Sequence, residues 1–211
     1  MNKAGRRTVY RHTIEETVPA MQNSSQHRIV SDDADQLILV NSADEPVGTL
    51  DKAACHDGQG TLHRAFSLFI LNSAGELLLQ QRHASKRLWP AYWANSCCSH
   101  PRAGESMEQA VQRRAEEELG IQVQPQFLYK FEYQASYGGL GAEHELCWVY
   151  LARSDARPQV NLTEVQDWRW VTPEALDAAL TRLPEQYTPW LHLEWSRLQR
   201  DFADLLRPAS D

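Results

Sequence analysis

The chain has 211 residues, 42% of them hydrophobic, and a formal net charge of −7. Its length suits one domain with a sizeable core, and its hydrophobic content excludes a disordered chain. The acidic balance argues against a general binder of nucleic acids or membrane surfaces, and no apolar run approaches the length of a membrane span. Because four cysteines are too few for a disulfide framework in a chain of this size, we expect a cytoplasmic protein.

The N-terminal 35 residues differ in character from the rest of the chain. Residues 1–35 are polar and lack clear periodicity, and Glu15 and Glu16 argue against a transit peptide. We expect a mobile extension that carries none of the chemistry. The folded domain is expected to span residues 36–207.

The first part of this domain has strand patterns. An apolar run at 37–40 is followed by turn residues at 41–46 and by a second run that passes through Leu50. The segments 65–71 and 77–82 predict two strands joined by a hairpin.

Later segments alternate between helix and strand. Good helix formers fill 105–119, and Gly120 stands where a helix C-cap belongs. Further strands are expected at 127–137, 143–153 and 167–171, and further helices begin after Thr172 and Thr188, each followed by a proline. This order predicts an α/β (α+β) protein with a mixed β-sheet packed between helices.

Between the second hairpin strand and the first helix, a basic and aromatic loop, RHASKRLWPAYW, leads into WANSCCSHP. Adjacent cysteines cannot easily bond to each other without distorting the peptide between them. Cys97 and Cys98 could therefore be metal ligands, reactive thiols or two ordinary buried thiols.

Two carboxylates and three histidines suggest a metal site. In a strand, Glu143 and Glu145 point to the same face as the apolar residues that follow, so they are expensive to bury unless a cation neutralises them. The alternative is that this end of the strand is exposed. With His56, His63 and His100, the two carboxylates would form an octahedral nitrogen and oxygen site suited to Mn²⁺, Mg²⁺ or Zn²⁺. A competing set is a structural zinc held by Cys55, Cys97 or Cys98 and His100.

One stripe of the predicted helix ends in a pair of opposite charges. Met107, Val111, Arg114 and Glu118 share this stripe because of their spacing. The pair Arg114 and Glu118 is either a surface ion pair or a binding group for an anion and a metal.

The stretch HPRAGESMEQAVQRRAEEELGI resembles the Nudix box: Gly, five residues, Glu, seven residues, Arg-Glu, an apolar residue, any residue, Glu-Glu, any residue, Gly and an apolar residue. The positions that fit are Glu105, Arg113, Glu117, Glu118, Gly120 and Ile121. Ser99 replaces the first Gly, and Arg114 replaces the Glu after Arg113. The second change argues against hydrolysis, since Nudix hydrolases gather catalytic cations with the carboxylates of the box.

Several motifs together resemble the type I isopentenyl-diphosphate delta-isomerases, a branch of the Nudix superfamily. They are TLHRAFS, SKRLWPAYW, NSCCSHP, EHELC and the late TPW, and the likeness covers about Leu37 to about Leu206. The resemblance implies conversion of isopentenyl diphosphate to dimethylallyl diphosphate through a tertiary carbocation. Such a reaction needs a positioned acid, a positioned base, a face rich in π electrons and exclusion of water.

The resemblance also implies roles for individual residues. Cys98 and Glu145 would transfer the protons, Tyr133 would assist Glu145, and Trp190 would lie against the cation. The implied metal ligands are His56, His63, His100, Glu143 and Glu145 for Mn²⁺ or Zn²⁺, with Glu118 and the Cys98 carbonyl for a Mg²⁺ that bridges the diphosphate. The implied diphosphate contacts are Lys52, Arg82, Lys86 and Arg114.

Two other functions remain open at this point. One is a Nudix pyrophosphohydrolase acting on nucleoside diphosphate derivatives, and the other is a binding module without catalysis. The expected partner is a small diphosphate, with no nucleic acid or membrane, and the expected oligomeric state is a monomer or weak dimer.

Overall fold

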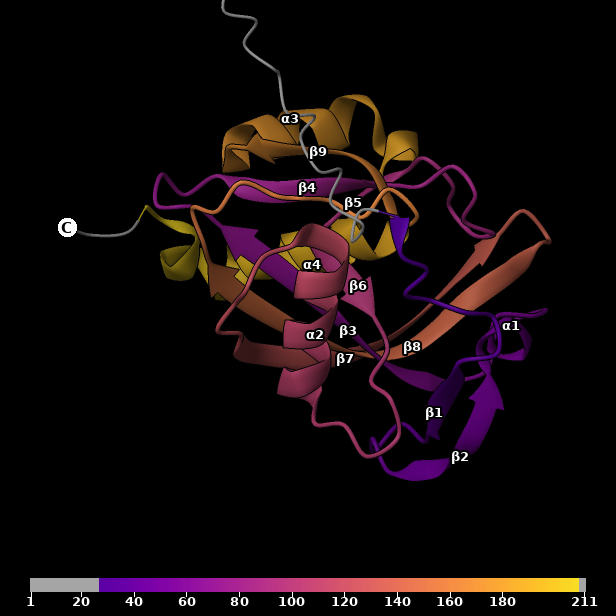
Figure 1. Ribbon diagram of the computed structural model, residues 1–211. Helices are drawn as coiled ribbons and strands as arrows, with labels where there is room; N and C mark the ends of the chain where they lie inside the picture. Colours follow the sequence, from indigo (N-terminus) through magenta and orange to yellow (C-terminus); the bar gives the residue numbers. More distant parts are fainter. Residues whose placement is uncertain (1–26, 209–211) are drawn as a thin grey trace, which may run out of the picture.

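A computed structural model describes residues 27–208, so most of the predicted extension lies outside the described residues. The described part contains nine strands of one sheet and four α-helices (Figure 1). The strands are β1 (Gln36–Val40), β2 (Pro46–Asp51), β3 (His63–Leu71), β4 (Leu77–Arg82), β5 (Trp93–Ala94), β6 (Cys97–Ser99), β7 (Gln126–Tyr137), β8 (Gly141–Arg153) and β9 (Val165–Val171). The helices are α1 (Lys52–Cys55), α2 (Met107–Leu119), α3 (Pro173–Arg182) and α4 (Pro189–Asp201).

Strand β3 is the organising strand of the sheet. It pairs in parallel with β8 over nine residues and antiparallel with β1, β4 and β6. Strands β7 and β8 form a long antiparallel hairpin, and β9 pairs antiparallel with β4. The sheet is therefore mixed, as the sequence predicted.

Helices cover both faces of this sheet. On β3, Phe66, Leu68 and Ile70 pack in a cluster with α2, whereas Phe69 and Leu71 pack with α3 and α4. Figure 1 shows α2 in front of the sheet and α4, in yellow, behind it. Because successive strand residues point to opposite faces, a strand buried on both sides must be continuously apolar, which the sequence of β3 nearly is.

The predicted elements agree closely with the observed ones. Helix α2 begins after Ser106, whose side chain accepts from the Gln109 backbone N–H in a capping box, and it ends at Gly120 in the left-handed conformation (φ 65°). The Thr172 side chain caps the start of α3 by accepting from the Ala175 backbone N–H. The last predicted helix ends at Asp201, and a short 3₁₀ turn continues to Leu206.

Three short elements were not predicted: α1, β5 and β6. Elements of two to four residues carry no periodic pattern, so tertiary pairing alone defines them. Strand β6 pairs Cys98 with Ser67 of β3, and this pairing fixes the position of the two cysteines. Within the described residues, no helix is long and apolar enough to cross a membrane.

Candidate active site

A cavity of about 540 Å³ opens where β4, β6, β7 and β8 meet the loop between β4 and β5. All but one of the residues predicted to form the site line this cavity. They are Lys52, His56, Arg82, Lys86, Cys98, His100, Arg114, Glu118, Tyr133, Glu143, Glu145 and Trp190. The exception, His63, is fully buried and lies against His100. Segments spread over 139 positions of the chain, from Lys52 to Trp190, thus converge on one space.

Strand register explains part of this convergence. Tyr133 of β7 is paired with Glu145 of β8, and Glu145 is in turn paired with His63 of β3. Directly paired residues project to the same face, so these three side chains form one row across the sheet. Further along β3, the same face of the sheet packs against α4. The row of polar side chains lies toward the end of this face that opens into the cavity.

The adjacent cysteines point in opposite directions, as consecutive residues of a strand do. Cys97 is fully buried in the cluster with α2, whereas Cys98 lines the cavity. All four cysteines are free thiols. Burial, followed by the charge of Glu194, raises the pKa of Cys98 well above its ordinary value, so the thiol is neutral. Of the two, only Cys98 can act on a molecule in the cavity.

Three histidines and Glu143 form a compact cluster. One ligand atom from each of His56, His63, His100 and Glu143 lies within 4.8 Å of the others. The distance is 3.1 Å between the Nε2 atoms of His63 and His100, and 2.7 Å between His56 Nε2 and Glu143 Oε2. Glu145 Oε1 lies 3.5 Å from His100 Nε2 and extends the cluster toward the cavity.

The hydrogen bonds behind two of these rings suit metal binding. His56 Nδ1 lies 2.6 Å from the Lys52 carbonyl oxygen, and His63 Nδ1 lies 2.7 Å from that of Thr61. Because a carbonyl only accepts, each Nδ1 carries the hydrogen, so the neutral form of each ring has its lone pair on Nε2, toward the centre of the cluster. Burial lowers the pKa of His63 to about 4, so its ring is neutral as a ligand must be. The cluster could hold a divalent metal ion.

Within the described residues, two alternatives from the sequence are wrong: an exposed strand end at Glu143 and Glu145, and a structural zinc held by cysteines. Glu143 is 8% exposed, so this end of its strand is not a solvated surface. A zinc site with cysteines is not assembled. Cys97 faces α2, the Cys55 thiol donates to the Leu50 carbonyl, the Cys98 thiol donates to Asn95 Oδ1, and no cysteine belongs to the histidine cluster.

Two neighbours have opposite effects on the pKa of the Glu145 carboxyl: the hydrogen bond from Tyr133 lowers it, and the charge of Glu143 raises it. The Tyr133 hydroxyl donates to Glu145 Oε2 over 2.8 Å. Burial and the nearby Glu143 nevertheless raise the pKa of Glu145 well above its ordinary value. A carboxyl whose pKa is raised in this way can donate a proton as a general acid or, once deprotonated, accept one as a base.

An aromatic wall closes one side of the cavity. The Trp190 ring lies edge-on to Trp89 at 5.2 Å, and Tyr133 lies 6.4 Å from it. The Arg82 guanidinium lies 5.4 Å from the centre of the Trp190 ring and donates to the carbonyls of Leu88 and Trp89. This wall offers apolar surface and π electrons to a ligand.

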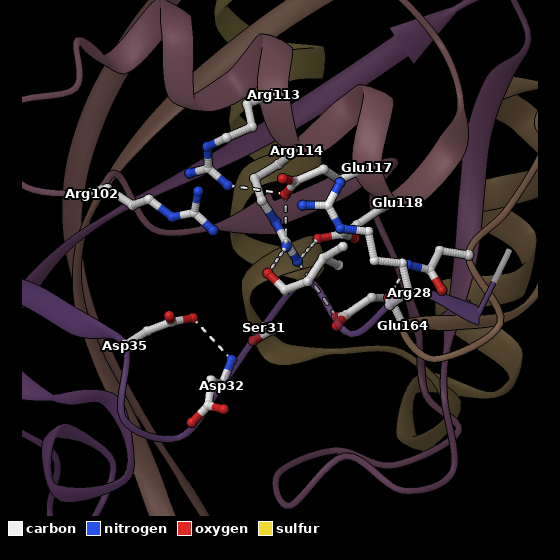
Figure 2. A network of polar contacts seen from close by, with 12 residues as sticks. Arg28, Ser31, Asp32, Asp35, Arg102, Arg113, Arg114, Glu117, Glu118 and Glu164 are labelled. Atoms are coloured by element: carbon white, nitrogen blue, oxygen red, sulfur yellow. Dashed lines mark hydrogen bonds and ion pairs between the residues drawn. The ribbon is translucent and has the colours of Figure 1, made fainter. Parts of the chain in front are cut away.

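The opposite end of the cavity is a network of buried charges around Arg114 (Figure 2). Arg114 contacts the carboxylates of Glu118, Glu117 and Glu164, and Lys86 also contacts Glu164. Arg114 is 3% exposed, and although burial opposes its charged form, Glu118 and Glu164 raise its pKa, so it stays charged. Arg114 and Glu118 are therefore not a surface ion pair, and both line the cavity.

Sequence reasoning missed Glu164. It lies in the loop before β9, lines the cavity and joins two of the predicted diphosphate contacts, Lys86 and Arg114. A glutamate in a polar loop gives no pattern from which a site could be inferred.

The segment before β1 also reaches the site. The Val30 carbonyl accepts from Arg114 over 2.7 Å, Ser31 contacts the Lys52 ammonium, and Ile29 and Asp33 line the cavity. Burial and nearby Lys86 lower the pKa of Lys52. This part of the predicted extension thus lies closer to the site than its polar composition indicated.

The histidine cluster leads to a prediction about metal affinity. We expect His100→Ala to weaken binding of Mn²⁺ or Zn²⁺ at least about 10- to 100-fold, because even residues behind a metal ligand contribute that much. Isothermal titration calorimetry measures the affinity. His192, which is half-buried and lies outside the cluster, provides the control, and equal affinities for His100→Ala and His192→Ala would argue against a metal at this cluster.

Comparison with known proteins agrees with this geometry. Residues 61–193 match the model of the NUDIX domain family. The chain is 43% identical over 174 residues to isopentenyl-diphosphate delta-isomerase 1 of Photorhabdus laumondii, an alignment that covers 82% of this chain and 99% of the relative. It is 39% identical over 166 residues to an isopentenyl-diphosphate delta-isomerase of Paenarthrobacter aurescens, covering 78% and 90%.

Solved structures show the same fold. DR0079 from Deinococcus radiodurans superposes with a TM-score of 0.63 at 28% identity, covering 77% of this chain and 98% of that one. A MutT protein from Methanosarcina mazei superposes with a TM-score of 0.56 at 20% identity, covering 66% and 94%.

Proposed function

The chain belongs to the isopentenyl-diphosphate delta-isomerase family within the NUDIX domain proteins, and we propose from this that it converts isopentenyl diphosphate to dimethylallyl diphosphate. The observation that carries the proposal is the set of residues that line one cavity. Two groups able to transfer protons, Cys98 and Glu145, line it together with the aromatic surface of Trp190 and a cationic end at Arg114.

The proposed reaction moves one double bond by two proton transfers. One group adds a proton to the terminal alkene carbon, which leaves a tertiary carbocation, and the other removes a proton from carbon 2. Cys98 and Glu145 carry out these transfers, so one of them loses a proton and the other gains one in each turnover. The Tyr133 hydroxyl holds the Glu145 carboxyl in place through its 2.8 Å hydrogen bond.

The aromatic wall stabilises the cation and excludes water. Trp190 is 3% exposed, and its ring would meet the carbocation through a cation–π contact. Water in this space would trap the cation as an alcohol, so a largely buried wall protects the product.

The charged end binds the diphosphate. Lys52, Arg82, Lys86 and Arg114 are proposed to contact its oxygens, and Glu118 with the Cys98 carbonyl would hold a bridging Mg²⁺. His56, His63, His100, Glu143 and Glu145 are proposed to hold Mn²⁺ or Zn²⁺, which would supply positive charge to the Glu145 carboxyl. We further propose a cytoplasmic enzyme that acts as a monomer or weak dimer.

Turnover in heavy water tests the function directly. Purified protein with isopentenyl diphosphate and Mg²⁺ is followed by proton and phosphorus NMR together. We expect dimethylallyl diphosphate containing deuterium and no released phosphate. Released phosphate would indicate a hydrolase, and an unchanged spectrum from folded, metal-loaded protein would indicate a binding module.

Loss of one cation at the charged end should affect substrate binding. We expect Lys86→Met to raise KM for isopentenyl diphosphate about 10-fold or more, because a hydrogen bond to a charged group contributes about 1.5–3 kcal/mol. Lys130 also pairs with a buried carboxylate, Asp44, but does not line the cavity. Steady-state kinetics of Lys130→Met therefore give the control, and an equal KM in both variants would contradict the assignment of Lys86.

A further inference from the structure

A buried amide lies behind the cavity wall, between β5 and β6. The Asn95 side chain is fully buried and is not among the groups that line the cavity. Its Nδ2 donates to the carbonyls of Leu68 over 3.1 Å and Cys97 over 3.2 Å. Since carbonyls only accept, these two contacts require the NH₂ on that side and so fix the direction of the amide oxygen.

The amide oxygen of Asn95 accepts hydrogen bonds from two residues that line the cavity. Asn95 Oδ1 accepts from the Cys98 thiol over 2.7 Å and from the Trp190 indole N–H over 3.2 Å. Both donors and both acceptor positions of the amide are therefore occupied. A fully satisfied buried amide of this kind is rigid, and it ties a sulfur on β6 to a ring on α4.

We propose that Asn95 is a positioning residue that sets the thiol of Cys98 and the ring of Trp190 in fixed geometry for the isomerisation. The inference rests on the proposed function, in which the thiol transfers a proton and the ring faces the resulting cation. Both groups must address the same few carbon atoms, and a misplacement of about 1 Å can cost about 100-fold in rate.

The hydrogen bond also sets the resting state of the thiol. Its hydrogen points at Asn95 and away from the cavity, so proton transfer requires a turn about the Cβ–Sγ bond. Rotation about this bond displaces only the hydrogen and leaves the sulfur in place, while the strand pairing of Cys98 with Ser67 holds the backbone. Neither the aromatic wall nor the metal cluster supplies this constraint.

Two substitutions separate the amide oxygen from the rest of the side chain. Asn95→Leu keeps the branched shape of the side chain and has no acceptor, and we expect kcat to fall about 100-fold with KM changed less than about 3-fold. Asn95→Asp keeps an acceptor oxygen, and we expect it to retain at least about 10-fold more kcat than the leucine variant. Initial rates of dimethylallyl diphosphate formation and thermal melting are measured on each variant.

Ser96 is the matched control for lost buried hydrogen bonds. It is fully buried, donates to the Leu78 carbonyl and accepts from the Ile70 backbone N–H, but it contacts neither Cys98 nor Trp190. We expect Ser96→Ala to lower the melting temperature with kcat within about 2-fold of the unmodified protein. If Asn95→Leu folds and keeps its kcat, or if Ser96→Ala loses as much kcat, the proposal is overturned.

A second measurement needs neither a folded Asn95 variant nor turnover. The indole N–H resonance of Trp190, assigned with Trp190→Phe, is compared by NMR in Cys98→Ala and Cys97→Ala. Because one oxygen accepts both hydrogen bonds, we expect Cys98→Ala to move the resonance and Cys97→Ala to leave it in place. An unmoved resonance in Cys98→Ala overturns the shared oxygen. If the unmodified protein does not form dimethylallyl diphosphate, the proposed function fails, whatever this resonance does.

Discussion

Replacing Cys98 with alanine is expected to lower kcat for dimethylallyl diphosphate formation by about 10²- to 10⁴-fold, the range that a positioned acid or base contributes. The thiol lines the cavity, and no other thiol among the described residues does so. The backbone carbonyl of residue 98 is retained, and the thiol is not part of the histidine cluster, so metal affinity should not change.

Cys97 supplies the control for this substitution. It is the chain neighbour of Cys98 and is fully buried, but its side chain packs against α2. We expect Cys97→Ala to lose stability through a small cavity and to keep kcat within a few-fold. Normal turnover by a folded Cys98→Ala protein would show that the thiol transfers no proton in this reaction.

Replacing Glu194 with glutamine is expected to stabilise the protein at alkaline pH by several kcal/mol. Glu194 lies on α4, fully buried behind Cys147, whose thiol lies 3.6 Å from its Oε1. Its Oε2 has no hydrogen-bond partner within residues 27–208. Burial raises the pKa of Glu194 from 4.5 to about 8, and this shift corresponds to roughly 5 kcal/mol.

The sign follows from proton binding. A carboxyl with a raised pKa binds more protons in the folded state than in the unfolded state between about pH 4.5 and 8, so stability falls as pH rises through this range. Glutamine does not titrate, and its advantage over glutamate should be small at pH 5 and full above pH 8. Other titratable groups packed around Glu194 are common to both proteins: Cys98, Tyr129, Tyr133, Glu145 and Cys147.

Urea unfolding at several pH values measures this difference. Glu185 is exposed on the short turn before α4, and Glu185→Gln should show no comparable pH-dependent gain. A constant difference between Glu194→Gln and the unmodified protein from pH 5 to 9 would show that Glu194 titrates normally despite its burial.

Arg114 relates the fold of this protein to its chemistry. The residue stands where the Nudix box has a glutamate, and here it neutralises Glu118 and Glu164 in the buried network. Removing one member of such a network leaves an uncompensated buried charge, which typically costs about 3–5 kcal/mol. Arg114, whose presence argues against a hydrolase, is therefore also needed to neutralise the buried carboxylates next to α2.

The sequence by itself determined the long elements and most of the cavity residues. The apolar runs, the helix-forming segment that ends at Gly120 and the Thr-Pro starts at Thr172 and Thr188 predicted the order of strands and helices. These features are local, and local backbone energetics specify them without knowledge of the rest of the chain. The Nudix box and the isomerase motifs indicated which side chains to expect in the site.

Only the tertiary structure decided how these side chains meet. The two-residue β5 and three-residue β6 have no pattern of their own, yet pairing of β6 with β3 directs Cys98 into the cavity and Cys97 into the core. The parallel register of β3 and β8 sets His63 beside Glu145.

The partners of buried polar groups were likewise beyond the sequence. Glu164 and Glu194 stand in unremarkable local sequence, and Asn95 stands in the NSCCSHP motif without a role predicted for it. The importance of all three comes from contacts with residues distant in the chain: Arg114, Cys147 and Trp190. A local sequence pattern determines which face a side chain occupies. Its hydrogen-bond partner and its pKa depend on what the folded chain packs against that face, and this is decided only when the layers assemble.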